Sequence, residues 1–375
     1  MSLPPQPGQW GPGNPPPSGP PQGYPPGPPQ PPGYYPQPGW GAQQPPPPPK
    51  QGNSLKWLLI AVAVLLVIAI TVGVTLFFTR GSGGGGTTTP TASDIASAND
   101  TGPVAVITVE PTCASWRPIQ NVLAATQSNG WGERDPSTPA SAWTADQRAQ
   151  YEAVGSGMRT AADQVVALAK QTPHRVMREI YAQFMAYGRA YADSLPSYEP
   201  ADDLLSRVNV SFSQTISTIC DAIDLGSVAS RASTVQSADP PSEQPGIGDL
   251  TQPRRFLTAS NPSCAEWIAN DTTFTTDTDP WAEIDSKIPA TQWTPDQRGV
   301  QERAAGTFNT FADDVEKLGR QSANAVFEDI ATLAALYLRA YSNAIQTYVV
   351  ADGYLVVPSL RIDNAVTYAC KAAAG

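Results

Sequence analysis

The stretch WTADQR at residues 143–148 returns 150 residues later as WTPDQR at residues 293–298. The same offset then holds until the chain reaches Cys220 in the first half and Cys370 in the second. Because chance does not preserve one register from residue 143 to residue 220, the pattern indicates an internal duplication. It predicts three segments, which we call copy 1 (residues 104–225), the linker (226–260) and copy 2 (261–375).

Each copy has the sequence pattern of a helical bundle. Thr144 and Gln147 fit the S/T-x-x-E/Q capping box that starts a helix, and in copy 2 Pro295 occupies the first helical position, where its missing N–H costs nothing. In copy 1, apolar residues then recur at helical spacing within residues 154–168, 180–195 and 205–220. With a shorter helix over residues 113–126, the sequence predicts a mainly α fold with a four-helix bundle in each copy. The one β-like run is Val104 to Val109.

The four cysteines lie at the ends of the copies. Cys113 and Cys264 open the related motifs CASW and CAEW, and Cys220 and Cys370 close the two copies. An even number of cysteines predicts two disulfides in an oxidising compartment. The pairing that respects the repeat joins Cys113 to Cys220 and Cys264 to Cys370. A zinc site is the alternative, but the spacing of structural zinc ligands is absent.

The N-terminal segment differs from the rest in composition. Residues 1–49 contain 22 prolines and 9 glycines, so we predict a disordered Pro/Gly-rich tail over residues 1–53. Within it, Pro31, Pro32 and Tyr34 resemble the Pro-rich ligands that are recognised as polyproline helices. The tail is therefore a candidate interaction motif as well as a solvated segment.

An uncharged apolar run, Trp57 to Thr79, follows the tail. It is long enough to cross a hydrocarbon core of about 30 Å, which predicts a transmembrane helix over residues 55–79. Two lysines precede the run and one arginine follows it, so the positive-inside rule favours a cytoplasmic N-terminus. We therefore expect a single-pass plasma-membrane protein with a flexible stalk over residues 80–103 and an extracytoplasmic ectodomain. The two copies are expected to be separate domains, like beads on a string, joined by a flexible linker, unless an interface between them is buried.

Charge excludes one class of partner. The first 93 residues contain no acidic residue, and residues 94–375 contain 20 basic and 33 acidic residues, a balance of −13. A nucleic-acid-binding domain needs a basic face to meet phosphates. We therefore expect no nucleic-acid partner.

Two pairs of charged residues are the candidate binding residues. Asp163 and Arg189 in copy 1 correspond to Asp313 and Arg339 in copy 2, and all four are predicted to lie within helices. They form either a structural ion pair between helices or the polar lining of a ligand groove. Trp143 and its equivalent Trp293 precede the capped helix as a hydrophobic staple, with carbohydrate stacking as the alternative.

No motif for catalysis is found. The single histidine, His174, follows Pro173 at a helix start, and copy 2 has asparagine in its place, so an exposed turn residue is the simplest interpretation. With the cysteines paired, no Cys–His or Ser–His–Asp arrangement is supported. Walker and dinucleotide-binding motifs are also missing. The sequence thus predicts no enzyme, no cofactor and no metal site.

The composition of the N-terminal segment resembles that of a known class of membrane proteins. The segments QGYPP at residues 22–26 and GYYP at residues 33–36, followed by one span and a disulfide-bearing ectodomain rich in Thr, Ala and Asp, resemble uncharacterised single-pass membrane proteins of mycobacteria and related actinobacteria. Arginine outnumbers lysine 17 to 6, as is typical of a GC-rich genome. The resemblance implies a cell-envelope protein and carries no functional residues over.

These observations lead to two hypotheses. The first is a non-enzymatic, membrane-anchored envelope protein whose ectodomain binds or scaffolds protein partners. The second is an extracytoplasmic sensor or carrier that holds a small molecule or lipid inside its bundles. A scaffold predicts filled bundles and surface grooves, whereas a carrier predicts an apolar tunnel.

Overall fold

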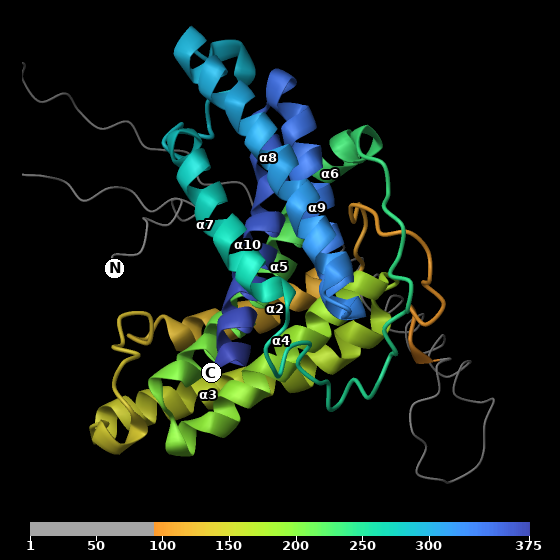
Figure 1. The fold of residues 1–375 in the computed structure, drawn as a ribbon. Helices are drawn as coiled ribbons and strands as arrows, with labels where there is room; N and C mark the ends of the chain where they lie inside the picture. The colour runs from red at the N-terminus through yellow and green to blue at the C-terminus, as the bar shows by residue number, and fades with distance from the viewer. Residues whose placement is uncertain (1–93) are drawn as a thin grey trace, which may run out of the picture. The chain divides into compact units, whose positions relative to one another are not determined.

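A computed structural model describes residues 94–375 (Figure 1), and these residues belong to one unit of the chain. The predicted tail with Pro31, Pro32 and Tyr34, the predicted span over residues 55–79 and most of the predicted stalk lie outside the described residues. No helix of the described part is both long and apolar enough to cross a membrane.

The prediction of a mainly helical fold is confirmed for the described residues, which contain four long helices in each copy. Copy 1 has α2 (Cys113–Gln127), α3 (Ala145–Gln171), α4 (Arg175–Ser194) and α5 (Asp203–Asp224). Copy 2 has α7 (Ser263–Ala282), α8 (Pro295–Gln321), α9 (Ala325–Ala344) and α10 (Gly353–Ala374). A short helix, α6 (Ser227–Arg231), begins the linker. Single 3₁₀ turns connect the helices at Ala140–Ala142, Leu195–Ser197, Pro200–Asp202, Ala232–Thr234, Ala290–Gln292, Ile345–Thr347 and Val350–Asp352.

The start of α3 shows why the repeated hexapeptide matters. The Thr144 hydroxyl accepts a hydrogen bond from the Gln147 backbone N–H at 3.2 Å, and the Gln147 side chain accepts one from the Thr144 N–H at 2.9 Å. Thr294 and Gln297 repeat this capping box at the start of α8. Two of the four backbone donors that a helix start leaves free are thereby satisfied.

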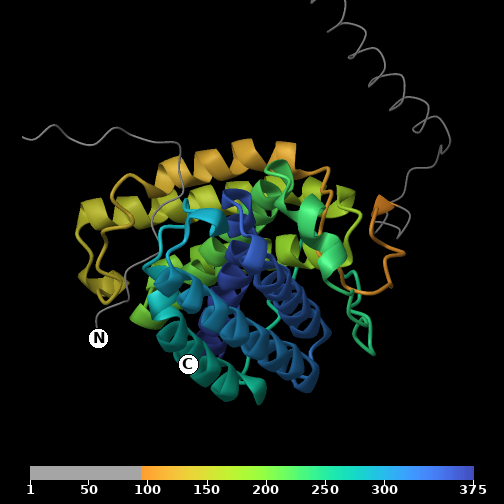
Figure 2. The same cartoon turned by 90° about the horizontal axis from the view of Figure 1, so that it is seen from above.

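Both predicted disulfides are present. Cys113–Cys220 joins α2 to α5, and Cys264–Cys370 joins α7 to α10. No described cysteine is free. Since α2 and α7 are the outermost long helices of their copies (Figure 2), each bond ties an edge helix to the middle of the molecule.

The two copies pack against each other, so the expectation of separate beads is wrong. The final helices α5 and α10 lie along each other, and α4 contacts α9. Most apolar side chains on these four helices are buried, among them Phe184, Phe212, Leu336 and Ile362. The sequence pattern showed which face of each helix is apolar, but the partner of that face belongs partly to the other copy.

A buried ion pair crosses this interface. Arg175 on α4 donates from Nε and Nη2 to the two carboxylate oxygens of Asp329 on α9, at 2.8 and 2.9 Å. Its Nη1 donates to the carbonyls of Asp100 and Gly102. Asp329 is 0% exposed and Arg175 2%. Every charge in this contact is therefore paired and hydrogen-bonded, as burial requires.

The linker is held against both copies and is not the loose connection that its Pro and Gly content predicts. Phe256 packs its ring edge-on against Tyr187 and Phe212 of copy 1 and against Phe327 of copy 2, at centroid distances of 6.0, 6.3 and 5.7 Å. At its other end Arg231 donates to both carboxylate oxygens of the buried Asp352. Buried aromatic anchors of this kind fix a segment whatever its intrinsic flexibility.

Two further expectations are corrected near the start of copy 1. The predicted β run makes a single antiparallel bridge, between Val104 and Ala238, because the linker supplies only one partner residue to pair with it. The last part of the predicted stalk, residues 94–103, is packed and not flexible. Ile95 is buried there, and Ser97 accepts hydrogen bonds from Arg178 at its hydroxyl and at its carbonyl.

Candidate ligand-binding grooves

The four candidate charged residues form equivalent ion pairs in the two copies. Arg189 on α4 donates from Nη2 to Oδ1 of Asp163 on α3 at 2.7 Å, and Arg339 on α9 donates to Asp313 on α8 at 2.6 Å. The aspartate side chains are 74% and 73% exposed. The arginine side chains are only 17% and 25% exposed, so each pair lies at the edge of the packed helices with its aspartate toward solvent. The pairs therefore mark two polar helix–helix surfaces.

In copy 1 this surface is the floor of a groove with a cavity volume of about 840 Å³. Helices α3 and α4 form one side, and residues 252–258 of the linker form the other. Arg189 connects the two sides, because its Nη1 donates to the Thr251 carbonyl at 2.7 Å while its Nη2 holds Asp163. We call this hollow the copy 1 groove.

The linker side of the copy 1 groove is fixed in position. Gln183 on α4 donates from Nε2 to the Arg254 carbonyl at 3.2 Å, and its Oε1 accepts from the Phe256 N–H at 2.8 Å. Gln183 is itself buried. The two hydrogen bonds, together with the buried Phe256 ring, hold the backbone of Arg254 and Arg255 before any ligand arrives, which lowers the entropy cost of binding.

Four arginines and two aspartates set the charge of the copy 1 groove. Arg159 pairs with Asp193 at 2.6 Å, and Arg189 pairs with Asp163. Arg254 and Arg255 make no ion pair within the described residues, although the Arg255 guanidinium lies 5.8 Å from the centre of the Tyr187 ring. The lining therefore holds four positive and two negative side chains, a balance of +2. The positive charge of this groove contrasts with residues 94–375 as a whole, whose net charge is −13.

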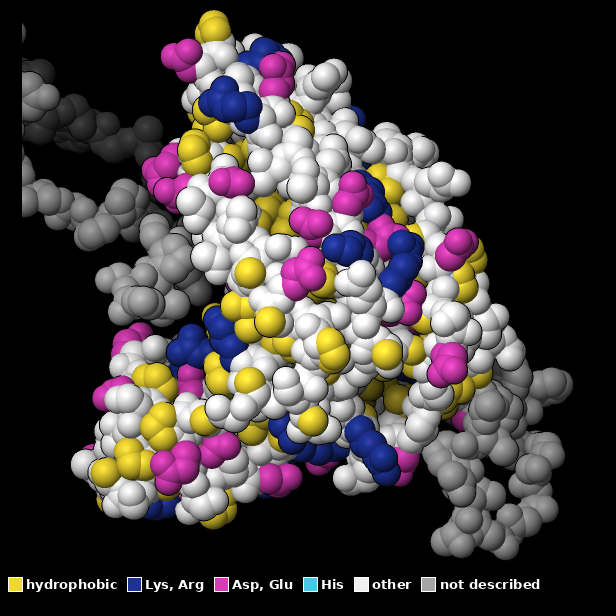
Figure 3. All heavy atoms as spheres, in the orientation of Figure 1, with side chains coloured by type: hydrophobic (Ala, Val, Ile, Leu, Met, Phe, Trp, Pro, Cys, Tyr) yellow, Lys and Arg dark blue, Asp and Glu magenta, His cyan; other side chains and the backbone are white. Residues whose placement is uncertain are grey.

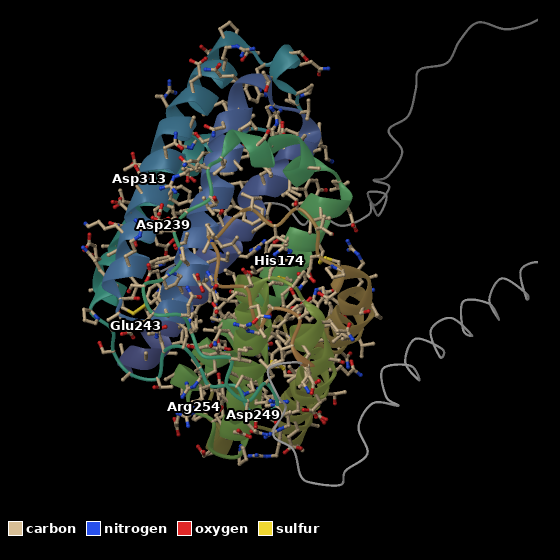
Figure 4. The ribbon with its side chains drawn as sticks, turned by 90° about the vertical axis from the view of Figure 1, so that its right-hand side faces the viewer. His174, Asp239, Glu243, Asp249, Arg254 and Asp313 are labelled. Atoms are coloured by element: carbon tan, nitrogen blue, oxygen red, sulfur yellow. A yellow bond between two sulfur atoms is a disulfide. The ribbon has the colours of Figure 1, made fainter. Side chains whose placement is uncertain are left out.

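Copy 2 has the equivalent groove, with a different charge. Its cavity volume is about 520 Å³, and the first half of the linker, residues 234–239, covers it. Arg339 pairs with Asp313 and also with Glu316 at 2.6 Å, and Glu316 pairs with Arg320. With Asp239 included, two positive and two negative side chains line it, a balance of zero. Figure 4 shows the linker passing from Asp239, on the side of Asp313, to Asp249 and Arg254 at the other end.

The other candidate residues have structural contacts. Trp143 packs against Tyr151 with the ring centroids 4.0 Å apart and the planes tilted by 32°. It donates from Nε1 to the Thr138 carbonyl, and Trp293 likewise donates to the Ile288 carbonyl. Both tryptophans are buried, so the carbohydrate-stacking alternative is wrong. His174 is half-buried, with Nε2 2.8 Å from the Val109 carbonyl. It is thus less exposed than the turn residue that we expected.

Two buried carboxyl groups carry perturbed pKa values. Burial and the neighbouring Asp329 carboxylate raise the pKa of Glu179, and both of its carboxyl oxygens lack a hydrogen-bond partner. Burial and Asp271 raise the pKa of Asp363, whose Oδ1 accepts from Trp267 Nε1 at 2.9 Å. Neither acid lines the two grooves. The described residues also contain no group of three or more side chains placed to hold a metal ion.

Substituting Glu179 by glutamine is expected to make the free energy of unfolding less dependent on pH, because Glu179 is buried and its pKa is raised. Glu179 faces Asp329, Arg175 and Arg178. Because its pKa is raised on folding, the folded state binds more protons, and stability falls as pH rises from about 4.3 to the raised value. Thermal unfolding between pH 4 and pH 8 should show this decline in the wild type and a smaller one in Glu179→Gln. Glu243→Gln, at an exposed site, is the control; equal pH profiles for all three proteins would contradict the prediction.

Sequence reasoning missed the residues that give the copy 1 groove its charge. Arg254 and Arg255 lie in the Pro-rich linker, which we interpreted as a connection. The adjacent basic pair beside an apolar FL at residues 256–257 was the one available signal. That these arginines meet Arg159 and Arg189 follows only from the path of the linker across α3 and α4.

The structure thus defines a duplicated, disulfide-closed helical domain with two linker-covered polar grooves. The chain belongs to the family described as mycobacterial ESX-1 associated protein, whose family model matches residues 95–375. An uncharacterised protein of Mycolicibacterium smegmatis (strain MKD8) is 48% identical to it over 285 residues, which are 76% of this chain and 76% of the relative. No solved structure matches the chain. The family description associates its members with ESX-1, which indicates a secretion-related envelope role.

Proposed function

We propose that this protein is a non-enzymatic, membrane-anchored component of the cell envelope whose ectodomain binds and scaffolds protein partners of the ESX-1 secretion system. The observation that carries the proposal is the joining of the two copies into one body through α5 and α10, with polar grooves left on the outside. A rigid body with preformed grooves is suited to holding partners in a fixed arrangement.

The carrier alternative has less support. Aromatic side chains occupy the bundle cores, as when Trp116 meets Tyr181 and Phe184 edge-on at 6.1 and 5.2 Å. A small hollow between α2 and α3, lined by Ile119, Val122 and Leu123 among others, has a cavity volume of about 260 Å³. Pockets for drug-sized ligands run from about 300 to 1,000 Å³. This hollow is therefore a weak candidate for a lipid site.

Crosslinking in intact mycobacteria tests the proposal. The full-length protein and a variant lacking residues 1–50 would be crosslinked, purified and analysed by mass spectrometry. We expect both to carry crosslinks from residues 94–375 to secretion-system proteins. If the variant lacking residues 1–50 lost these crosslinks, recognition would lie outside the ectodomain, which would contradict the proposal. A retained lipid or small molecule in native mass spectra, without protein partners, would favour the carrier.

The membrane anchor is tested separately. The full-length chain should stay in the membrane pellet after alkaline carbonate extraction, because a span of about 20 apolar residues inserts stably. A variant lacking residues 55–79 should be released. Release of the full-length protein by carbonate would contradict anchoring and leave the ectodomain proposal to be judged by its crosslinks.

A further inference from the structure

The copy 1 groove has the properties of a site for an anionic group. Arg159, Arg189, Arg254 and Arg255 line one hollow, and two of these arginines already bind carboxylates there, those of Asp193 and Asp163. Guanidinium groups form strong, often two-pronged hydrogen bonds with carboxylates. Arg254 and Arg255 remain unpaired within the described residues, on a backbone that Gln183 holds in place. Figure 3 shows a group of Lys and Arg side chains at the lower edge of the face in view.

The duplication provides an internal comparison. In copy 2, Asn309 and Asn343 replace Arg159 and Asp193, and Glu316 occupies the groove and pairs with both Arg320 and Arg339. Its arginines are therefore neutralised by the protein itself, whereas in copy 1 Arg254 and Arg255 have no carboxylate partner within the described residues. Only the copy 1 groove has positive charge left for a ligand.

We propose that the copy 1 groove binds an acidic peptide segment of a protein partner, with Arg254 and Arg255 as the principal contacts. An open groove between two helices and an extended linker segment fits a peptide lying along it. The occupant is not the N-terminal segment of this chain, since its first 93 residues contain no Asp or Glu. This inference rests on the proposed scaffold function and names the chemistry of the partner.

Binding of a labelled peptide by the full-length protein in detergent tests the inference. The probe is fluorescein-labelled hexaglutamate, followed by fluorescence polarisation, with hexaglutamine as the neutral control peptide. We expect the wild type to bind hexaglutamate, and the double variant Arg254→Gln/Arg255→Gln to bind it at least about tenfold more weakly. The copy 2 variant Arg320→Gln is the matched control and should bind as the wild type does. Raising the salt from 50 to 500 mM should weaken wild-type binding, because Arg254 is exposed and Arg255 only half-buried.

Several results would overturn the inference. These are equal binding by the double variant, an equal loss in Arg320→Gln, or stronger binding to vesicles containing phosphatidylglycerol than to the peptide. Arg254→Glu, at an exposed side chain, repeats the test if the double variant has a lowered melting temperature. If hexaglutamate fails to bind while ectodomain crosslinks to secretion proteins persist, this inference falls and the proposed function stands. If hexaglutamate binds but no such crosslinks form, the anion-binding groove stands and the proposed scaffold function falls.

Discussion

Replacing Arg175 with alanine is expected to lower the free energy of unfolding by about 3–5 kcal/mol. The substitution leaves the Asp329 carboxylate 0% exposed, with its two hydrogen bonds from Arg175 lost and the Glu179 carboxyl beside it. An uncompensated buried charge is among the few single changes with an effect this large. Chemical denaturation followed by circular dichroism would measure it.

The control for Arg175 is an arginine whose pair is exposed. Arg159→Ala breaks the ion pair with Asp193, whose two side chains are 47% and 65% exposed, and should cost no more than about 1 kcal/mol. The double variant Arg175→Ala/Asp329→Ala should recover part of the loss, because neither charge is then left unpaired. Equal losses for Arg175→Ala and Arg159→Ala would show that the interface between the copies does not depend on the buried pair.

Removing the disulfide of copy 1 with Cys113→Ser/Cys220→Ser is expected to cost about 4–5 kcal/mol in the chain-entropy treatment of a loop of about 100 residues. The bond spans 107 residues, and the bond between Cys264 and Cys370 spans 106. Because α2 packs mainly on α3 and meets α5 near the bond, removing the bond should destabilise α2 before the other helices.

Hydrogen exchange and thermal unfolding together check this prediction. In the double serine variant, amide protection should fall in α2 before it falls in α5, which α10 and α4 also cover. The equivalent variant Cys264→Ser/Cys370→Ser should loosen α7 in the same way. An unchanged melting temperature, or first loss of protection in α10, would contradict the role of the bonds as ties for the outer helices.

The sequence by itself determined the local structure and the covalent frame. The capping residues Thr144 and Gln147 act within one helical turn, so their pattern is readable without a fold. The repeat register from residue 143 to residue 220 assigned the disulfides, since only one pairing lets each copy close a bond within itself. The repeat also singled out Asp163 and Arg189, which we expected to form either an ion pair between helices or the lining of a ligand groove. Both alternatives follow because residues on neighbouring helices of one bundle share a surface.

Only the tertiary structure decided how the copies and the linker combine. The contact of Arg175 with Asp329 joins residues 154 positions apart, and copy 2 has Ala325 where copy 1 has Arg175, so the repeat gave no indication of it. Proline and glycine in the linker predicted flexibility, but Phe256 enters an aromatic cluster shared by both copies and overrides that local preference. The position of Arg254 and Arg255 beside α4 follows from this burial. A long-range apolar contact sets where the chain runs, and its partner cannot be read from the residues next to it in sequence.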